Sequence, residues 1–181
     1  MSIQNKALVI IDMQNDFIDG ALANKDTQAI IPKMVKYINN FDGNLIVFTK
    51  DTHYDSTYLD SQEGKKLPIK HCIYGTIGWD VDMTLYNAAS AWAVNHKDRA
   101  VEFIHKRNFG SFSVPEYCRD SEEIIMCGTC TDICVISNVL IMKSTLPETP
   151  IKVLKDLCAG TTPEMHNKAL DIMKSCQVEV I

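Results

Sequence analysis

The sequence predicts an α/β fold in which a mostly parallel six-stranded sheet carries helices on both faces, a Rossmann-like three-layer sandwich. Short apolar runs alternate along the chain with segments whose apolar residues recur at helical spacing. Strands that alternate with helices pair in parallel, because each helix brings the chain back to the end of the sheet at which the previous strand began. The 181 residues, 46% of them hydrophobic, are enough for one core, so we expect a single domain, 1–181.

Six apolar runs are predicted to form the strands. Each is short and rich in β-branched or aromatic residues, a composition that favours extended backbone. In chain order the runs are Ala7–Ile11, Leu45–Thr49, Val101–Ile104, Glu123–Cys127, Ile151–Leu154 and Val178–Ile181.

Four segments between these runs are predicted to form helices. The first places Ile30, Met34 and Ile38 on one stripe, and the last opens with Thr162 before a proline, a typical helix start. In chain order the segments are Thr27–Phe41, Met83–Val94, Ile133–Lys143 and Pro163–Ser175.

Composition limits the class of partner. A net charge of -5 and a pI of about 5.5 argue against nucleic acid or an anionic membrane. No stretch approaches the roughly 20 apolar residues that cross a bilayer, and the N-terminus lacks the layout of a signal peptide. The seven scattered cysteines then indicate reduced thiols. We expect a cytoplasmic protein that acts on a small molecule.

Polar residues follow four of the predicted strands. Asp12 follows the first strand, Asp51 and His53 the second, and Lys106 the third, while a cysteine-containing loop follows the fourth. In parallel α/β sheets, ligands collect at the carboxyl ends of the strands. One shared site therefore explains these residues better than chance placement on the surface.

Cys134 is the candidate nucleophile. It follows the predicted strand that ends at Gly128, and both Thr131 and Asp132 are good N-cap residues. Cys134 should then lie on the first turn of a helix. There the helix dipole and free amide groups lower the pKa of a thiol and hold a developing oxyanion.

Asp12 and Lys106 each have a catalytic and an ordinary interpretation. Asp12 suits a general base that takes the thiol proton of Cys134 and returns it to the leaving group, but aspartate also commonly caps turns. Lys106 suits a partner that keeps a buried Asp12 ionised, but most lysines are simply solvated.

Asp51, His53 and His71 are candidate metal ligands, with Glu63 as a tentative fourth. The Asp-x-His spacing brings two ligands together, and a third arrives from a later segment. Carboxylate and imidazole donors suit zinc, iron or manganese, and zinc is the first choice. The alternative is that these histidines are solvated in a long polar loop.

Four aromatic residues follow strand ends and are candidates for the wall of a pocket that holds a flat ring. Core packing is the equally plausible alternative for any one of them. They are Phe17, Trp79, Phe109 and Phe112.

Taken together, these motifs resemble the isochorismatase-like cysteine hydrolases, and within them the nicotinamidases. The resemblance covers nearly the whole chain. It rests on Asp12-Met-Gln-Asn-Asp-Phe17, Asp51-Thr-His53, His71-Cys-Ile-Tyr-Gly-Thr-Ile-Gly78, Lys106 with Phe109-Gly-Ser-Phe112, and Gly128-Thr-Cys-Thr-Asp-Ile-Cys134.

The resemblance implies a catalytic triad of Asp12, Lys106 and Cys134. It implies an oxyanion hole formed by the backbone amides of Cys130 and Cys134, with a cis peptide bond at Thr129–Cys130. It also implies that a metal ion holds a pyridine nitrogen and that Phe17 is an aromatic wall.

Three departures from the family pattern concern the substrate. Tryptophan is more usual where Thr52 stands, and alanine or another small apolar residue where Cys130 stands. The segment Tyr54–Lys70 replaces a loop with a further histidine, and Glu63 is its obvious substitute ligand.

We therefore expect a metal-dependent cysteine amidohydrolase that converts nicotinamide to nicotinate and ammonia through a thioester. An alternative is a related hydrolase of another amide, a ureido or a carbamoyl substrate. A third hypothesis is a non-catalytic metal- or thiol-binding protein, which leaves Asp12 and Lys106 unexplained. A homo-oligomer with contacts in Leu67–Trp79 is a further expectation.

Overall fold

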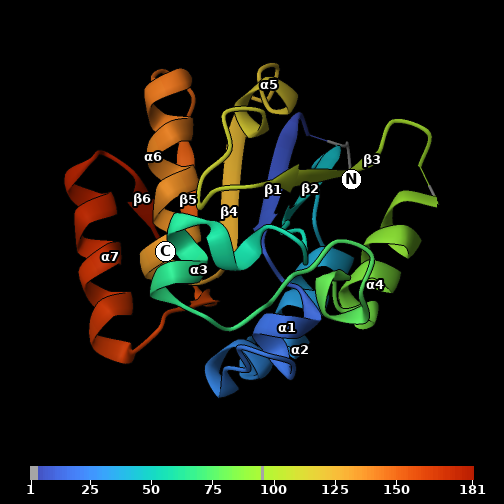
Figure 1. Cartoon of the computed structure of the whole chain (residues 1–181). Helices are drawn as coiled ribbons and strands as arrows, with labels where there is room; N and C mark the ends of the chain where they lie inside the picture. Colours follow the sequence, from blue (N-terminus) through green and yellow to red (C-terminus); the bar gives the residue numbers. More distant parts are fainter. Residues whose placement is uncertain (1–3, 95) are drawn as a thin grey trace.

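The computed structural model describes residues 4–94 and 96–181. They form one fully parallel six-stranded sheet in the order β3-β2-β1-β4-β5-β6 (Figure 1). The strands are β1 (Lys6–Ile11), β2 (Leu45–Asp51), β3 (Ala100–Lys106), β4 (Glu123–Thr129), β5 (Ile151–Ala159) and β6 (Glu179–Val180).

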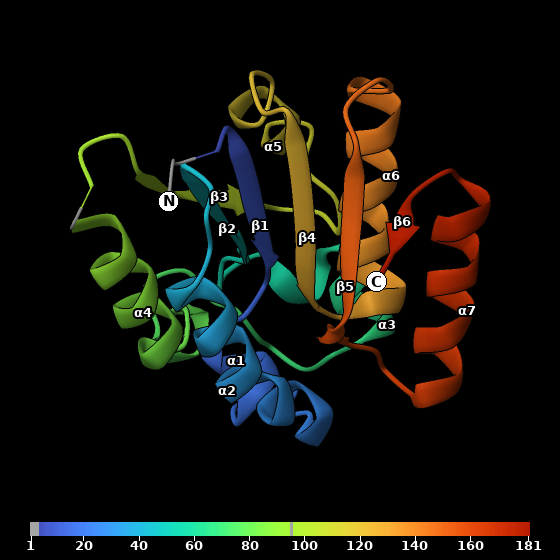
Figure 2. The same ribbon diagram turned by 180° about the vertical axis from the view of Figure 1, so that it is seen from behind.

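Helices cover both faces of this sheet, which confirms the predicted three-layer sandwich. Helices α2 and α4 pack together on one face, and α6 and α7 lie on the other (Figures 1 and 2). The helices are α1 (Asn15–Ile18), α2 (Lys25–Asn39), α3 (Gln62–Lys66), α4 (Met83–Val94), α5 (Val114–Tyr117), α6 (Ile136–Thr145) and α7 (Pro163–Ser175).

The core lies around the two central strands. Residues Ala7–Ile11 of β1 are fully buried, because helices cover the central strand on both faces. One cluster of apolar side chains joins all layers of the described residues, which supports the proposed single domain, 1–181. Residues 1–3 and 95 lie outside the described residues. The prediction that the N-terminus is not a signal peptide falls partly on them. No helix among the described residues is long and apolar enough to cross a membrane.

The predicted strands are confirmed, but four of them extend further toward their carboxyl ends. Strand β2 continues to Asp51 and β3 to Lys106, so two candidate site residues lie on the sheet rather than in loops. Each extension begins with a charged residue, a histidine or a glycine, namely Lys50, His105, Gly128 and Lys155, which is why hydrophobicity alone ended the strands too early.

The segment after β4 differs from the predicted helix Ile133–Lys143. A short π-helical turn, Thr131–Val135, comes first, and α6 begins at Ile136. Neither Thr131 nor Asp132 caps a helix, since the residue before the turn is Cys130 and makes no side-chain cap. The Asp132 carboxylate instead accepts hydrogen bonds from the backbone and hydroxyl of Thr161.

Gly128 fixes the close approach of β4 to β1. Its φ is +125°, and a Cβ atom there would lie 2.2 Å from the carbonyl oxygen of Ile11. We predict that Gly128→Ala strongly destabilises the protein, by more than about 3 kcal/mol, because backbone strain and a backbone clash add up. The change in unfolding free energy is measured by urea denaturation.

Gly75→Ala is the matched control. Gly75 also has a positive φ, +80°, but nothing lies within 4 Å of a Cβ placed there. Only the conformational cost of about 1–2 kcal/mol is expected. Equal losses in the two variants would contradict the steric explanation.

Candidate active site

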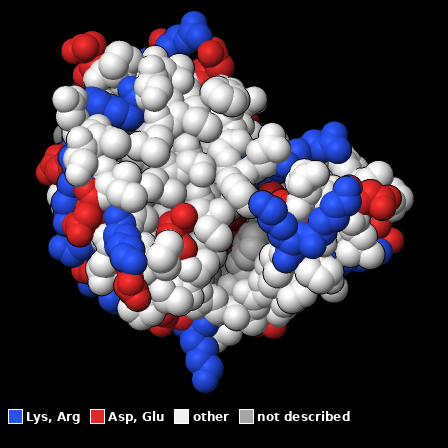
Figure 3. All heavy atoms as spheres, turned by 60° about the vertical axis from the view of Figure 1, so that its left-hand side comes forward, with Lys and Arg blue, Asp and Glu red and all other residues white. Residues whose placement is uncertain are grey.

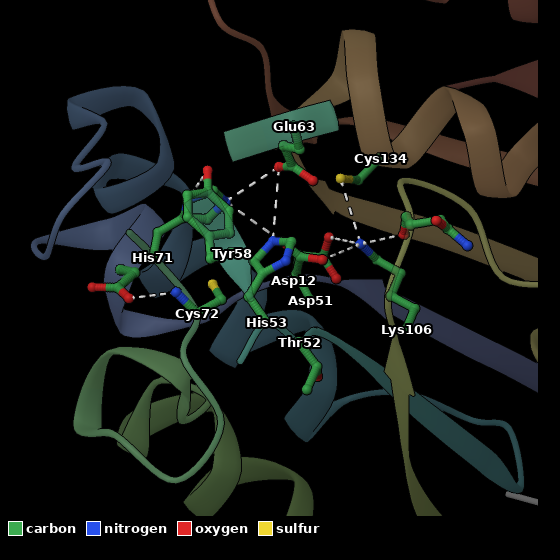
Figure 4. A network of polar contacts seen from close by, with 12 residues as sticks. Asp12, Asp51, Thr52, His53, Tyr58, Glu63, His71, Cys72, Lys106 and Cys134 are labelled. Carbon is green, nitrogen blue, oxygen red and sulfur yellow. Dashed lines mark hydrogen bonds and ion pairs between the residues drawn. The ribbon is translucent and has the colours of Figure 1, made fainter. Parts of the chain in front are cut away.

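The carboxyl ends of β1 to β4 bring the predicted residues into one cluster. Figure 4 shows Asp12, Asp51, Lys106 and Cys134 pointing toward one another from these four strands and the turn after β4. The two histidines and Glu63 lie on the neighbouring side of Asp51. The cluster therefore follows from the parallel topology, which places the carboxyl ends of all strands at the same end of the sheet.

Asp12 is fully buried directly after β1 and has a φ of 50°, in the left-handed region. Thr49 of β2 holds it there: the Thr49 hydroxyl donates to Asp12 Oδ1 at 2.6 Å and accepts from the Asp12 backbone N–H at 3.1 Å. The other oxygen, Oδ2, makes a 2.6 Å ion pair with Lys106. Asp12 is therefore held by Thr49 through one oxygen and by Lys106 through the other.

Lys106 lies at the centre of the charged cluster, with a side chain that is 1% exposed. Its Nζ atom is 2.6 Å from Asp12 Oδ2, 3.5 Å from Asp51 Oδ1 and 3.6 Å from Cys134 Sγ. Burial alone would lower the pKa of Lys106, but Asp12, Cys134 and Asp51 together raise it above its usual range. Lys106 is thus a permanent cation.

The pKa values of the two carboxyl groups beside Lys106 are shifted in opposite directions. Burial raises the pKa of Asp12, Lys106 opposes this shift, and Asp51 adds to it. Burial acts on Asp51 in the same direction, but Lys106 and the histidines His53 and His71 hold the pKa of Asp51 well below its usual range. The arrangement places a carboxyl group with a raised pKa, Asp12, beside one with a lowered pKa, Asp51.

The thiol of Cys134 is not acidified, contrary to the expectation from a helix N-terminus. Burial raises its pKa well above the usual value, the Asp12 carboxylate adds to this, and Lys106 opposes it. The π-helical turn and the depth of the site explain the difference, because desolvation disfavours a thiolate. The resting state is a neutral thiol beside a carboxylate.

The turn that carries Cys134 is fixed by side-chain hydrogen bonds. Asn138 donates to the carbonyl oxygens of Cys134 and Phe109, at 2.8 and 3.0 Å, and accepts from the Ser111 N–H. Just before the turn, the peptide bond Thr129–Cys130 is cis, as the resemblance implied.

Four donor groups converge on the other side of Asp51. Asp51 Oδ2 lies 2.9 Å from His53 Nε2 and 3.6 Å from His71 Nε2, while Glu63 Oε1 lies 3.7 and 3.5 Å from the same nitrogens. All four donor atoms lie within 4.8 Å of one another. Every residue predicted as a metal ligand, including Glu63, is therefore brought together.

This donor set fits a small divalent cation. Ligand bonds of about 2.1 Å in tetrahedral geometry place neighbouring donors about 3.4 Å apart, close to the observed spacings. The Asp12, Asp51 and Glu63 carboxylates with the single Lys106 ammonium leave negative charge in excess, which a divalent cation would neutralise.

The second histidine is oriented by a further layer of contacts. His71 Nδ1 lies 2.9 Å from the Ile69 carbonyl oxygen and 3.3 Å from the Tyr58 hydroxyl, so its Nε2 faces the donor cluster. Such contacts fix the orientation of metal-binding imidazoles. Burial lowers the pKa of His71, but bonds to Asp51 and Glu63 raise it overall to about 10.

A cavity of about 580 Å³ opens onto both halves of the cluster. Phe17 and Phe109 line it together with Cys134, Asp51 and His71. The prediction was wrong for the other two aromatic residues.

Neither of those residues lines this cavity. Phe112 is 81% exposed, and Trp79 donates a hydrogen bond to the Thr52 hydroxyl outside it. Thr52 itself is buried, and the indole of Trp79 lies against it from another segment.

Sequence reasoning missed three residues that hold the site in place. Thr49 binds Asp12, Asn138 binds the carbonyl of Cys134, and Gln14 bonds the backbone N–H and carbonyl of Asp51. The available signals were the position of Thr49 at a strand end and of Gln14 within the Asp12–Phe17 motif. Nothing in the sequence distinguished Asn138 from a surface polar residue of a helix.

Comparison with known proteins agrees with this geometry. The isochorismatase domain family matches residues 6–181. The chain belongs to the isochorismatase family.

Within the isochorismatase family, the chain is similar to several pyrazinamidases and nicotinamidases. The nicotinamidase/pyrazinamidase of Mycobacterium tuberculosis is 27% identical over 185 residues, 97% of this chain and 98% of that protein. The crystal structure of the pyrazinamidase/nicotinamidase of Streptococcus mutans has a TM-score of 0.78 at 27% identity and covers 97% and 99% of the two chains. The pyrazinamidase of Pyrococcus horikoshii, in complex with zinc, has a TM-score of 0.74 at 26% identity, with 98% of each chain covered.

We predict that the donor cluster binds one zinc ion and that His53→Ala or His71→Ala weakens the affinity by more than about 100-fold, since each removes a direct ligand. Zinc titration of metal-stripped protein by calorimetry measures this without reference to activity. His105→Ala, which removes a histidine outside the cluster, should bind zinc normally. Unchanged zinc affinity in both cluster variants would show that the four residues are not a metal site.

Proposed function

We propose that this chain is a metal-dependent cysteine amidohydrolase that converts nicotinamide to nicotinate and ammonia. The observation that carries the proposal is the Lys106 ammonium, which contacts Asp12, Cys134 and Asp51 and so joins a nucleophile to a donor cluster in one cavity. The similarity to proteins named nicotinamidase/pyrazinamidase supports the substrate.

The reaction begins with a neutral thiol. Because the pKa of Cys134 is raised, the sulfur needs a base at the moment of attack, and Asp12, whose carboxylate acts on this thiol, is proposed to take the proton. As the proton moves to Asp12, the sulfur forms a bond to the carboxamide carbon. The backbone amides of Cys130 and Cys134 are proposed to hold the oxyanion that forms.

Asp12 then returns the proton to the departing amine, which leaves as ammonia, and a thioester joins the acyl group to Cys134. A water molecule attacks the thioester carbon while Asp12 takes one of its protons. The carbon–sulfur bond breaks, the thiolate regains a proton, and nicotinate is released. Asp12 serves as base and acid in turn, which its elevated pKa favours.

Lys106 is proposed to keep Asp12 ionised in the resting enzyme. Without a neighbouring cation, a fully buried carboxyl group would be protonated and could not act as a base. The 2.6 Å ion pair therefore has a catalytic consequence as well as a structural one.

Asp51, His53, Glu63 and His71 are proposed to hold the divalent cation, with zinc as the first choice and iron or manganese compatible with the same donors. When bound, the cation supplies a Lewis-acid contact for the pyridine nitrogen of the substrate. Phe17 is proposed to contact the ring, and it lies edge-on to His71 at a centroid distance of 5.6 Å.

All seven cysteines are free thiols in the structure, which supports a proposed cytoplasmic location. A homo-oligomer with contacts in Leu67–Trp79 stays a prediction.

The first test is ammonia release from nicotinamide by zinc-loaded protein. We predict that Cys134→Ala lowers turnover by more than about 1,000-fold, because the nucleophile is removed. Cys176→Ala, which removes a thiol outside the cavity, should retain full turnover. Undiminished turnover in Cys134→Ala would exclude the mechanism.

If nicotinamide is not hydrolysed but iodoacetamide still alkylates Cys134 ahead of the other cysteines, the cysteine-hydrolase mechanism stands and the substrate is another amide. That outcome would favour the alternative of a related family hydrolase.

The pH profile tests the role of Lys106. Lys106 opposes the upward shift in the pKa of Asp12, so removing its charge should raise that pKa further. Because Asp12 must be ionised to act as a base, we predict that the acid limb of kcat/KM moves to higher pH in Lys106→Met. An acid limb at the same pH as in the unmodified enzyme would show that Lys106 does not set the ionisation of Asp12.

A further inference from the structure

A second cavity, of about 360 Å³, adjoins the catalytic cavity on the far side of the donor cluster. The two cavities share Glu63, Lys66 and Phe109 in their walls. Most residues that line the second cavity have polar side chains, among them His53, Arg107 and Asn108. The second cavity therefore lies directly beside the space in front of Cys134, with Glu63 between them.

Two cations line this second cavity and have no acidic partner. Lys66 and Arg107 are exposed at the rim of this cavity, and neither forms an ion pair with a carboxylate of the described residues. The exposed Lys70 and Lys168, in contrast, pair with Asp55 and Glu164. Unpaired cations facing a cavity attract an anionic group, and arginine in particular matches the two oxygens of a carboxylate.

The segment that carries Lys66 is held firmly. The Tyr58 hydroxyl donates to the Leu67 carbonyl at 2.8 Å, and Ser61 accepts from the Gly64 N–H at 2.9 Å, which fixes both ends of α3. A Cβ at Gly64 would lie 2.1 Å from the Tyr58 carbonyl oxygen, so α3 packs directly on the preceding turn. The same short helix thus places Glu63 in the donor cluster and Lys66 at the junction of the two cavities.

The position of Arg107 is also restrained. Its guanidinium carbon lies 5.3 Å from the ring centroid of Tyr54, which also lines the second cavity. The only carboxylate among the described lining residues is Glu63, and it is engaged by the two histidines. In Figure 3 the molecule is hollowed next to a group of Lys and Arg side chains.

The volume of the cavities also indicates a substrate larger than nicotinamide. The catalytic cavity alone, at about 580 Å³, falls in the range that holds ligands larger than a single-ring amide. Nicotinamide is neutral and would leave the second cavity and both cations without a role.

We propose that the preferred substrate is an amide that carries a carboxylate substituent, which binds to Lys66 and Arg107 in the second cavity while the amide lies against Cys134. This inference rests on the proposed amidohydrolase function and specifies its substrate class. Lys66 and Arg107 act as specificity residues and take no part in bond breaking.

The test compares two amides with the same pyridine ring. 5-Carbamoylpyridine-3-carboxylate carries the anion, and its methyl ester is the neutral counterpart. The metal-loaded protein should show a higher kcat/KM for the acid, and added salt should reduce that preference. In the double variant Lys66→Gln/Arg107→Gln, the ratio of acid to ester in kcat/KM should fall by about fivefold or more.

Lys65→Gln is the matched control, because Lys65 neighbours Lys66 on α3 but lines neither cavity. It should keep the preference for the acid. Equal kcat/KM for acid and ester, or a preference that survives in the double variant, would overturn the proposal.

Binding to Cys134→Ala separates this proposal from the proposed function. Calorimetry should show tighter binding of the acid than of the ester, and the difference should disappear when Lys66 and Arg107 are also replaced. Binding of this kind without ammonia release from any amide would retain the carboxylate site and overturn the amidohydrolase. Nicotinamide hydrolysis without a preference for the acid would retain the amidohydrolase and overturn the carboxylate site. Failure of both probes to bind would also overturn the carboxylate site.

Discussion

The site depends on one buried cation. The Lys106 ammonium is removed from water and lies between Asp12 and Asp51, with Cys134 as a third neighbour. Burying three charged groups costs several kcal/mol each unless they compensate one another. Replacing the lysine by a neutral residue would leave two carboxylates facing each other in a low dielectric. The same ion pairs that make the burial tolerable also connect the nucleophile to the donor cluster, so the two halves of the site cannot be positioned independently.

Much of this arrangement was predictable, because it follows from topology and residue type. Once the alternation of strands and helices indicated a parallel sheet, the residues after each strand had to meet at one edge, and Asp12, Asp51 and Lys106 were among them. Glu63, from a segment without any periodic pattern, was recoverable through the family resemblance, in which it stands where a loop usually supplies a further histidine. These inferences required only the order of elements and the chemistry of side chains.

Other features were beyond the sequence because they arise from tertiary contacts. The pKa of Cys134 is decided by desolvation and by Asp12, which override the local helix-terminus argument. Asp132 was expected to cap its own helix, but Thr161 from the loop before α7 supplies two donors that compete for the same carboxylate. Helix α3 has five residues, too few to show a period, and its place is set by Tyr58 and Ser61 rather than by an apolar face.

The spacing of the site residues along the chain has a consequence for folding. Asp12 meets Thr49 across 37 residues of sequence, and Lys106 meets Cys134 across 28. The donor cluster lies within residues 51–71, but Asp12, Lys106 and Cys134 follow or end three different strands, so no short segment contains them together. Long-range parallel pairing is slow to form, since loop closure precedes the contacts that offset its entropy. The grouping of Asp12, Lys106 and Cys134 is therefore a property of the completed sheet, and a newly made chain acquires it only after the distant strands have paired.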